Sequence, residues 1–103
     1  MKIYHPDQFT AAKAWGALDI ERLKDATVRL HWADEPYIWH VNDGPEIFVV
    51  LSGAVEMHVR TKTGDEIHRL DRGDIFHAEV GDEHKAHPLG EARILVIEQA
   101  GTI

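Results

Sequence analysis

The chain has 103 residues, of which 44% are hydrophobic, and a formal net charge of −7 at pH 7. That length supports one domain with one core, and the hydrophobic content is that of a globular protein rather than a disordered one. The acidic balance argues against nucleic acid and anionic membranes as partners. The lack of cysteine excludes disulfides, thiolate metal ligands and cysteine nucleophiles.

The amino-terminal segment carries few structural signals. Residues 1–9, MKIYHPDQF, lack the apolar stretch of a signal peptide, and no run in the chain is long enough to span a membrane. A cytoplasmic protein without a membrane partner is therefore expected. Residues 7–15, DQFTAAKAW, show weak helical features that would form no more than a turn or two.

The rest of the chain predicts an all-β fold. Short apolar or alternating runs, separated by turn signals, recur at a spacing of roughly 8–12 residues, which is typical of a sandwich or barrel. The predicted strands are residues 18–23, 27–32, 46–51, 54–60, 66–70, 75–80 and 92–99.

Two of these strands are apolar on both faces. In residues 46–51, Phe48 and Val50 share a face with Glu46, while Ile47 and Val49 point to the opposite side. Residues 92–99 show the same two-sided pattern. A strand of this kind needs cover on both faces, and the outer cover would come from the amino-terminal segment or a second subunit. Because two strands need it, a homodimer is predicted.

Three candidate metal ligands flank one turn. His40 and Asn42 project from the same side of an extended segment, and Glu46 begins the next strand after the turn at residues 42–45. If that strand folds back beside its predecessor, an imidazole, an amide oxygen and a carboxylate meet at one end of the fold.

The spacing of these residues resembles that of a known family. The series His40-x-Asn42-x3-Glu46-x6-Gly53 resembles the first motif of the cupins, His-x-His-x3–4-Glu-x6-Gly. Residues 73–84, GDIFHAEVGDEH, resemble the second motif, Gly-x5-Pro-x-Gly-x2-His, with a glutamate at the usual proline and His84 at its end. The resemblance covers residues 26–102 and is greatest to small single-domain cupins labelled mannose-6-phosphate isomerase-like.

The resemblance implies a single-domain jelly-roll β-barrel. Residues 1–25 would supply an irregular or helical segment and the first strand, and residues 26–103 would form the cupin domain. The family's divalent metal would be held by His40, Glu46 and His84, a set of the kind that binds Fe(II). Manganese, nickel and zinc are also compatible. Asn42 stands where the family usually has a second histidine, and it is either a weak oxygen ligand or a turn residue.

The other site candidates are weaker. His77 interrupts an apolar strand and is expected to be either a buried, hydrogen-bonded histidine or an acid or base lining the pocket. Trp32 lies on the apolar face of its predicted strand, where it would pack in the core or, with Phe48, line the pocket. The remaining histidines, among them His31 and His58, are expected at the surface.

Two functions fit these residues. One is a metal-dependent enzyme, an oxygenase or an isomerase or epimerase, that acts on a small polar organic molecule, with Glu46 and His77 as proton-transfer groups. The other is a binding or sensing module without turnover. Near the motifs the only cations are Arg72 and Lys85, which gives no basic cluster for a sugar phosphate. Serine hydrolase, phosphate-loop and dinucleotide motifs are absent.

Overall fold

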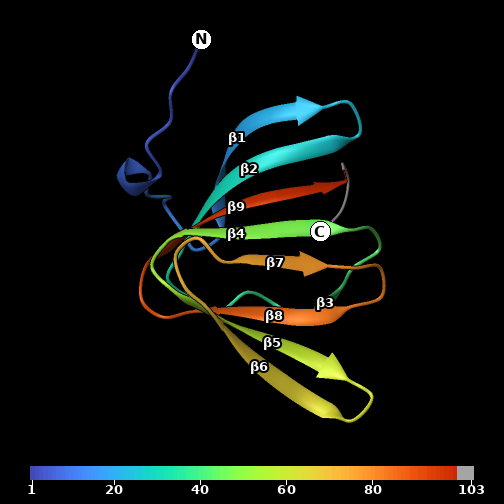
Figure 1. Cartoon of the computed structure of the whole chain (residues 1–103). Helices are drawn as coiled ribbons and strands as arrows, with labels where there is room; N and C mark the ends of the chain where they lie inside the picture. The colour runs from blue at the N-terminus through green and yellow to red at the C-terminus, as the bar shows by residue number, and fades with distance from the viewer. Residues whose placement is uncertain (100–103) are drawn as a thin grey trace.

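The computed structural model describes residues 1–99 and consists of two antiparallel sheets (Figure 1). The first sheet has five strands, in the order β1 (Gly16–Leu23), β2 (Ala26–Ala33), β9 (Ala92–Gln99), β4 (Glu46–Ser52) and β7 (Ile75–Ala78). The second sheet has four strands, in the order β3 (His40–Val41), β8 (Glu83–Pro88), β5 (Val55–Thr61) and β6 (Gly64–Leu70). The chain passes back and forth between the sheets, as in a jelly roll. The all-β prediction is confirmed.

The core lies between the two sheets. Alternate residues of β4 and β9, such as Val50 and Ile94, are fully buried on the inner face of the first sheet. They pack against Val55 and Met57 of β5 in the second sheet. Period-2 alternation explains why these residues face inward together, and it also carries polar residues at the strand ends into the same space.

The seven predicted strands all occur, but two short strands and the helix differ from expectation. Strand β8, which carries His84, was not predicted. The extended segment predicted at His40 forms the short strand β3, but it lies beside β8 in the second sheet and not beside β4. In place of helical structure over 7–15, the chain forms only the 3-10 turn η1 (Pro6–Gln8). The last residues of the predicted cupin domain, 100–103, lie outside the described residues.

The outer face of the first sheet is apolar and only partly covered. Arg93 Nε donates a hydrogen bond to Phe9 O at 3.0 Å, and η1 packs beside β4, so the amino-terminal segment covers one end of this face. Further along it, an apolar set is half buried: Val28, Ile47, Val49, Leu95 and Ile97. Beside this set Ile75 is 63% exposed.

Within residues 1–99, no helix has both the length and the apolar character required to cross a membrane.

Candidate metal site and pocket

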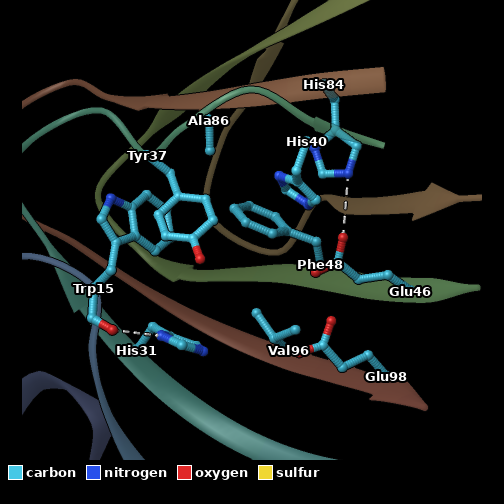
Figure 2. A pocket seen from close by; sticks show the side chains of 10 residues that line it. All are labelled: Trp15, His31, Tyr37, His40, Glu46, Phe48, His84, Ala86, Val96 and Glu98. Atoms are coloured by element: carbon cyan, nitrogen blue, oxygen red, sulfur yellow. Dashed lines mark hydrogen bonds and ion pairs between the residues drawn. The ribbon is translucent and has the colours of Figure 1, made fainter. Parts of the chain in front are cut away.

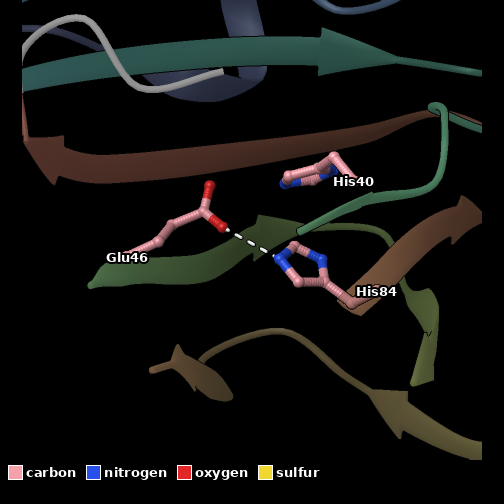
Figure 3. Close-up of side chains that lie close together, drawn as sticks. All are labelled: His40, Glu46 and His84. Carbon is pink, nitrogen blue, oxygen red and sulfur yellow. Dashed lines mark ion pairs between the residues drawn. The ribbon is translucent and has the colours of Figure 1, made fainter. Parts of the chain in front are cut away.

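Three potential ligands come together where the two sheets meet. His40 in β3 and His84 in β8 are direct partners across the second sheet, and Glu46 starts β4 in the first. One ligand atom from each lies within 4.8 Å of the other two (Figure 3). The structure thus brings together the set that the sequence singled out.

Backbone contacts of Asn42 fix this arrangement. Asn42 N donates to Asp82 O at 2.9 Å, and Gly81 N donates to Asn42 O at 2.8 Å. The loop before β8 is therefore held against the turn before β4, which aligns His84 with His40 and Glu46.

The side chain of Asn42 is part of the cluster as well. Its Oδ1 accepts a hydrogen bond from Nε2–H of His84 at 2.6 Å, and its Nδ2 lies 3.5 Å from Glu46 Oε1. His84 Nε2 also lies 3.3 Å from Glu46 Oε1. Asn42 is only 1% exposed, so it is not simply a surface turn residue. The amide holds both an imidazole and a carboxylate.

The protonation states suit a cation. Burial raises the pKa of Glu46, but the hydrogen bond and charge of His84, helped by Asn42 and His40, outweigh this and lower it overall. Burial, followed by the charge of His84, lowers the pKa of His40. Glu46 is therefore a carboxylate and His40 a neutral imidazole, which are the forms that bind metals.

Buried polar atoms without a hydrogen-bond partner test whether the cluster fits a metal ion. His40 Nε2 is buried and has no hydrogen-bond partner, which is costly unless something else occupies its lone pair. Two imidazoles and one carboxylate form a ligand set for divalent ions such as Fe(II), Mn(II), Ni(II) or Zn(II). The residues present therefore fit a divalent metal.

A cavity of about 80 Å³ adjoins the cluster (Figure 2). Its wall is largely aromatic: the ring centroid of Trp15 lies 5.3 Å from that of Tyr37 and 6.5 Å from that of Phe48. The complete lining consists of Trp15, His31, Tyr37, His40, Glu46, Phe48, His84, Ala86, Val96 and Glu98. The cluster therefore opens onto a small, mainly apolar pocket.

Glu98 is a second carboxyl group in this pocket. It lies opposite Glu46 in the β4–β9 register and is 8% exposed, and its Oε2 has no hydrogen-bond partner. Burial, and then the neighbouring Glu46, raise the pKa of Glu98 to about 7. Glu98 was not predicted as a site residue, although it falls on the same side of its strand as Ile94 and Val96.

His31 also lines the pocket, which corrects its expected surface position. It pairs with Ile94 on the inner face of the first sheet, and its Nδ1–H donates to Trp15 O at 3.0 Å. Burial lowers the pKa of His31, so the ring is neutral near pH 7. Trp15 and Tyr37 were not predicted either, because they lie in irregular segments or at a strand edge where no periodic signal exists.

Of the remaining candidate residues, one lines the pocket and two lie outside it. Phe48 lines the pocket as expected. Trp32 is 7% exposed but pairs with Arg93 on the outer face, so it packs away from the cavity. His77 requires a correction: it is exposed, on the outer face of β7 opposite Ile47. It is not buried, and it is not among the residues that line the pocket.

Comparisons with known proteins agree with this geometry. A family model described as "Cupin domain" matches residues 26–98. A cupin-2 domain containing protein from Shewanella frigidimarina is similar in structure, with 24% identity, a TM-score of 0.77, and coverage of 90% of this chain and 86% of that one. No curated protein matches the sequence at a significant level.

Two further solved structures share the fold at lower identity. A cupin superfamily protein from Desulfitobacterium hafniense is 12% identical, with a TM-score of 0.77 and coverage of 91% of this chain and 85% of that one. A hydroquinone 1,2-dioxygenase from Sphingomonas sp. TTNP3 is 14% identical, with a TM-score of 0.76 and coverage of 87% of this chain and 68% of that one.

Proposed function

The chain belongs to the cupin-domain family, and on that premise we propose that it is a small metalloprotein in which His40, Glu46 and His84 hold one divalent ion. The observation that carries this proposal is the meeting of their three ligand atoms within 4.8 Å. The buried, unpaired Nε2 of His40 supports it further. Iron(II), manganese, nickel and zinc are all compatible with two imidazoles and one carboxylate.

We further propose that the site is catalytic and acts on a small polar organic molecule. A divalent ion held by three protein ligands keeps open coordination positions and supplies Lewis-acid or oxygen-activating chemistry. The likeness to a hydroquinone 1,2-dioxygenase, solved with 4-hydroxybenzoate bound, keeps oxygenase chemistry among the candidates beside isomerase or epimerase chemistry.

The chain's own residues would perform three tasks. Asn42 holds His84 and Glu46 together before an ion binds, and the aromatic wall of Trp15 and Phe48 excludes water around the bound molecule. Glu46 lines the pocket, where its carboxylate can accept a proton from that molecule. The exposed His77 has no part in this scheme.

The alternative function is a binding module without turnover, and one observation favours it. His84 Nε2 donates a 2.6 Å hydrogen bond to Asn42 Oδ1. That proton must leave before the nitrogen can bind a metal, and the resulting competition weakens metal affinity. A pocket with weakly held metal would still bind small ligands.

Metal content of the purified protein tests the proposal. After loading separately with iron(II), manganese, nickel and zinc, elemental analysis should find about one ion per chain for at least one metal. The variants His40→Ala and His84→Ala should retain less than a tenth of it, because each removes one of only three strong ligands.

His77→Ala serves as the matched control, because it removes an exposed histidine outside the cluster. Its metal content should equal that of the wild type. Loss of metal in all three variants alike, or no uptake by the wild type, would refute the metal site. Ligand stabilisation of the metal-free protein in a thermal-shift screen would then favour the binding module.

We also propose that the chain forms a homodimer through the outer face of the first sheet. The half-buried residues Ile47 and Ile97 and the exposed Ile75 lie on this face, beyond the end that the amino-terminal segment covers. Contiguous apolar surface of this kind is typical of association sites, and a second copy would complete its burial.

A further inference from the structure

A second pair of histidines lies on the outer face of the second sheet. His58 on β5 and His87 on β8 belong to neighbouring strands of that sheet (Figure 1). Their rings are stacked, with the centroids 3.9 Å apart and the planes 28° apart. His58 alternates with the buried Met57, and His87 with the buried Ala86, so both rings face away from the core and from the proposed metal cluster.

Two charged residues complete a four-residue group on this face. In the β5–β8 register, His87 lies opposite Glu56, and His58 lies opposite Lys85. The two rings therefore occupy one diagonal of the group, and the carboxylate and the ammonium occupy the other. Because His58 and His87 come from different strands, the rings approach each other only when the second sheet has formed.

The state of the two rings suits the binding of a metal ion. Burial, followed by the charges of His58 and Lys85, lowers the pKa of His87, against the opposing charge of Glu56. His87 is therefore neutral near pH 7 and keeps one nitrogen lone pair. Within residues 1–99 no hydrogen bond engages either ring of the pair, whereas the exposed His68 of the same sheet has a carboxylate partner at 2.9 Å.

The separation of the rings is close to what one ion requires. Two nitrogen ligands that lie about 2.0–2.1 Å from a tetrahedral ion are about 3.3 Å from each other. Rings with centroids 3.9 Å apart and planes inclined by 28° can reach that separation through a small side-chain rotation. Stacking without an ion is the alternative, and it stabilises an aromatic pair by about 0.5–1.5 kcal/mol.

We propose that His58 and His87 form a second metal site, which binds one divalent transition ion with a preference for imidazole, such as zinc. Water completes the coordination, and the neighbouring carboxylate of Glu56 attracts the ion. This site does not depend on the proposed function, because it shares no residue with the cluster. With two protein ligands in place of three, it binds more weakly than the cluster and loses its ion on dialysis. A bound ion joins β5 to β8, the strand that carries His84.

Titration calorimetry with Zn²⁺ tests the proposal in the intact chain. The wild type should show a weak class of site that takes up a single ion. His58→Gln and His87→Gln should each weaken this class by at least about 100-fold, because two ligands held on one scaffold exceed a single ligand by that factor. His68→Gln is the matched control, since it removes an exposed histidine of the same sheet and should leave the weak class unchanged.

The two charged neighbours should shift the affinity in opposite directions. Lys85→Gln removes a positive charge beside the ion and should tighten zinc binding about threefold, whereas Glu56→Gln should weaken it by a similar factor. Both effects should shrink when the salt concentration is raised. Shifts of the same sign in the two variants would overturn the position assigned to the ion.

Failure of this proposal is distinguishable from failure of the metal cluster. His40→Ala removes a cluster ligand and should leave the weak class intact. Zinc should also raise the free energy of unfolding of this variant, and the added substitution His58→Gln should abolish the increase. A wild type without a weak class, or a weak class that survives both His58→Gln and His87→Gln, would leave only a stacked pair of rings. If the cluster takes up no metal, the weak class alone should remain, and its loss in the two variants supports the proposal.

Discussion

Asn42 stands where the first cupin motif usually has a second histidine, and its amide acts as a positioning group. Its Oδ1 and Nδ2 reach His84 and Glu46, respectively. A neutral amide is a weaker metal donor than imidazole, but it can hold an imidazole and a carboxylate at the same time. The substitution therefore preserves the geometry of the cluster at the cost of donor strength.

Replacing this amide should destabilise the metal-free protein. Asn42→Leu removes the 2.6 Å acceptor of His84 Nε2–H, and leaves that buried donor only the longer contact to Glu46. The free energy of unfolding should fall by about 1–2 kcal/mol in urea denaturation. Asp43→Leu, a change at the exposed neighbour in the same turn, should alter it by less than about 0.5 kcal/mol. Equal effects of the two substitutions would contradict the role given to Asn42.

The two facing carboxyl groups make stability depend on pH. The folded state raises the pKa of Glu98 from 4.5 to about 7, so the folded chain binds more protons than the unfolded chain between these values. This contribution to stability is fully present below pH 4.5 and is lost as the pH rises through about 7. The groups that act on Glu98 include Glu46 and Asp43, which raise its pKa, and Arg29, which lowers it.

Unfolding of the metal-free protein measured across this pH range checks the effect. The wild type should lose on the order of 2–3 kcal/mol relative to Glu98→Gln between pH 4.5 and 8, because one pKa unit corresponds to about 1.4 kcal/mol. The difference between the two proteins removes the contribution of histidines that titrate in both. Parallel curves for wild type and variant would show that Glu98 titrates normally.

At the scale of elements, strand prediction succeeded where side chains alternate and failed where they do not. The strands β4, β5 and β9 have clear apolar periodicity and were predicted to within about two residues. Strand β8, EHKAHP, has charged and imidazole side chains and no β-branched residue, so it gave no strand signal. Only the motif spacing identified His84, which lies on this strand.

The faces of β2 could not be predicted from polarity. His31 points into the pocket and Trp32 packs outward, because the amino-terminal segment covers this part of the outer face and makes both sides of the strand apolar environments. Conversely, Glu98 was predictable in principle, as the one charged residue on the inner side of β9. A charged side chain on a core face is rare without a function or a partner.

Two glycines of the resembled motifs should differ in how they tolerate a side chain. Gly53 has φ +73°, and a Cβ there would collide with the backbone oxygen of Glu91, whereas Gly73 has φ +90° and open space around it. Gly53→Ala should therefore lower the free energy of unfolding by about 3 kcal/mol through strain and overlap together. Gly73→Ala should cost only about 1 kcal/mol, from strain alone. Urea denaturation of both variants measures the difference, and equal losses would contradict it.

At the scale of the whole molecule, the proposed dimer can be tested by a substitution on the outer face of the first sheet. Ile75→Lys places a charge on the 63% exposed side chain beside the half-buried apolar set. It should convert the dimer to a monomer of 11.7 kDa in light scattering coupled to size-exclusion chromatography, because an unpaired charge in an apolar interface is strongly unfavourable.

Ile67→Lys provides the control for that experiment. Ile67 is 58% exposed but lies on β6 in the second sheet, away from the proposed interface. Its substitution should leave the dimer intact. A monomeric wild type, or a dimer that both variants disrupt equally, would place the association elsewhere or remove it.

The ligand cluster draws Glu46 from one sheet and His40 and His84 from the other. An ion bound there is available only to the chain in which both layers have assembled, so binding and folding are thermodynamically linked. Free ion at a hundred times its dissociation constant would add about 2.7 kcal/mol to the free energy of unfolding. The amount of folded protein in a cell would then rise and fall with the supply of that ion, independently of any reaction.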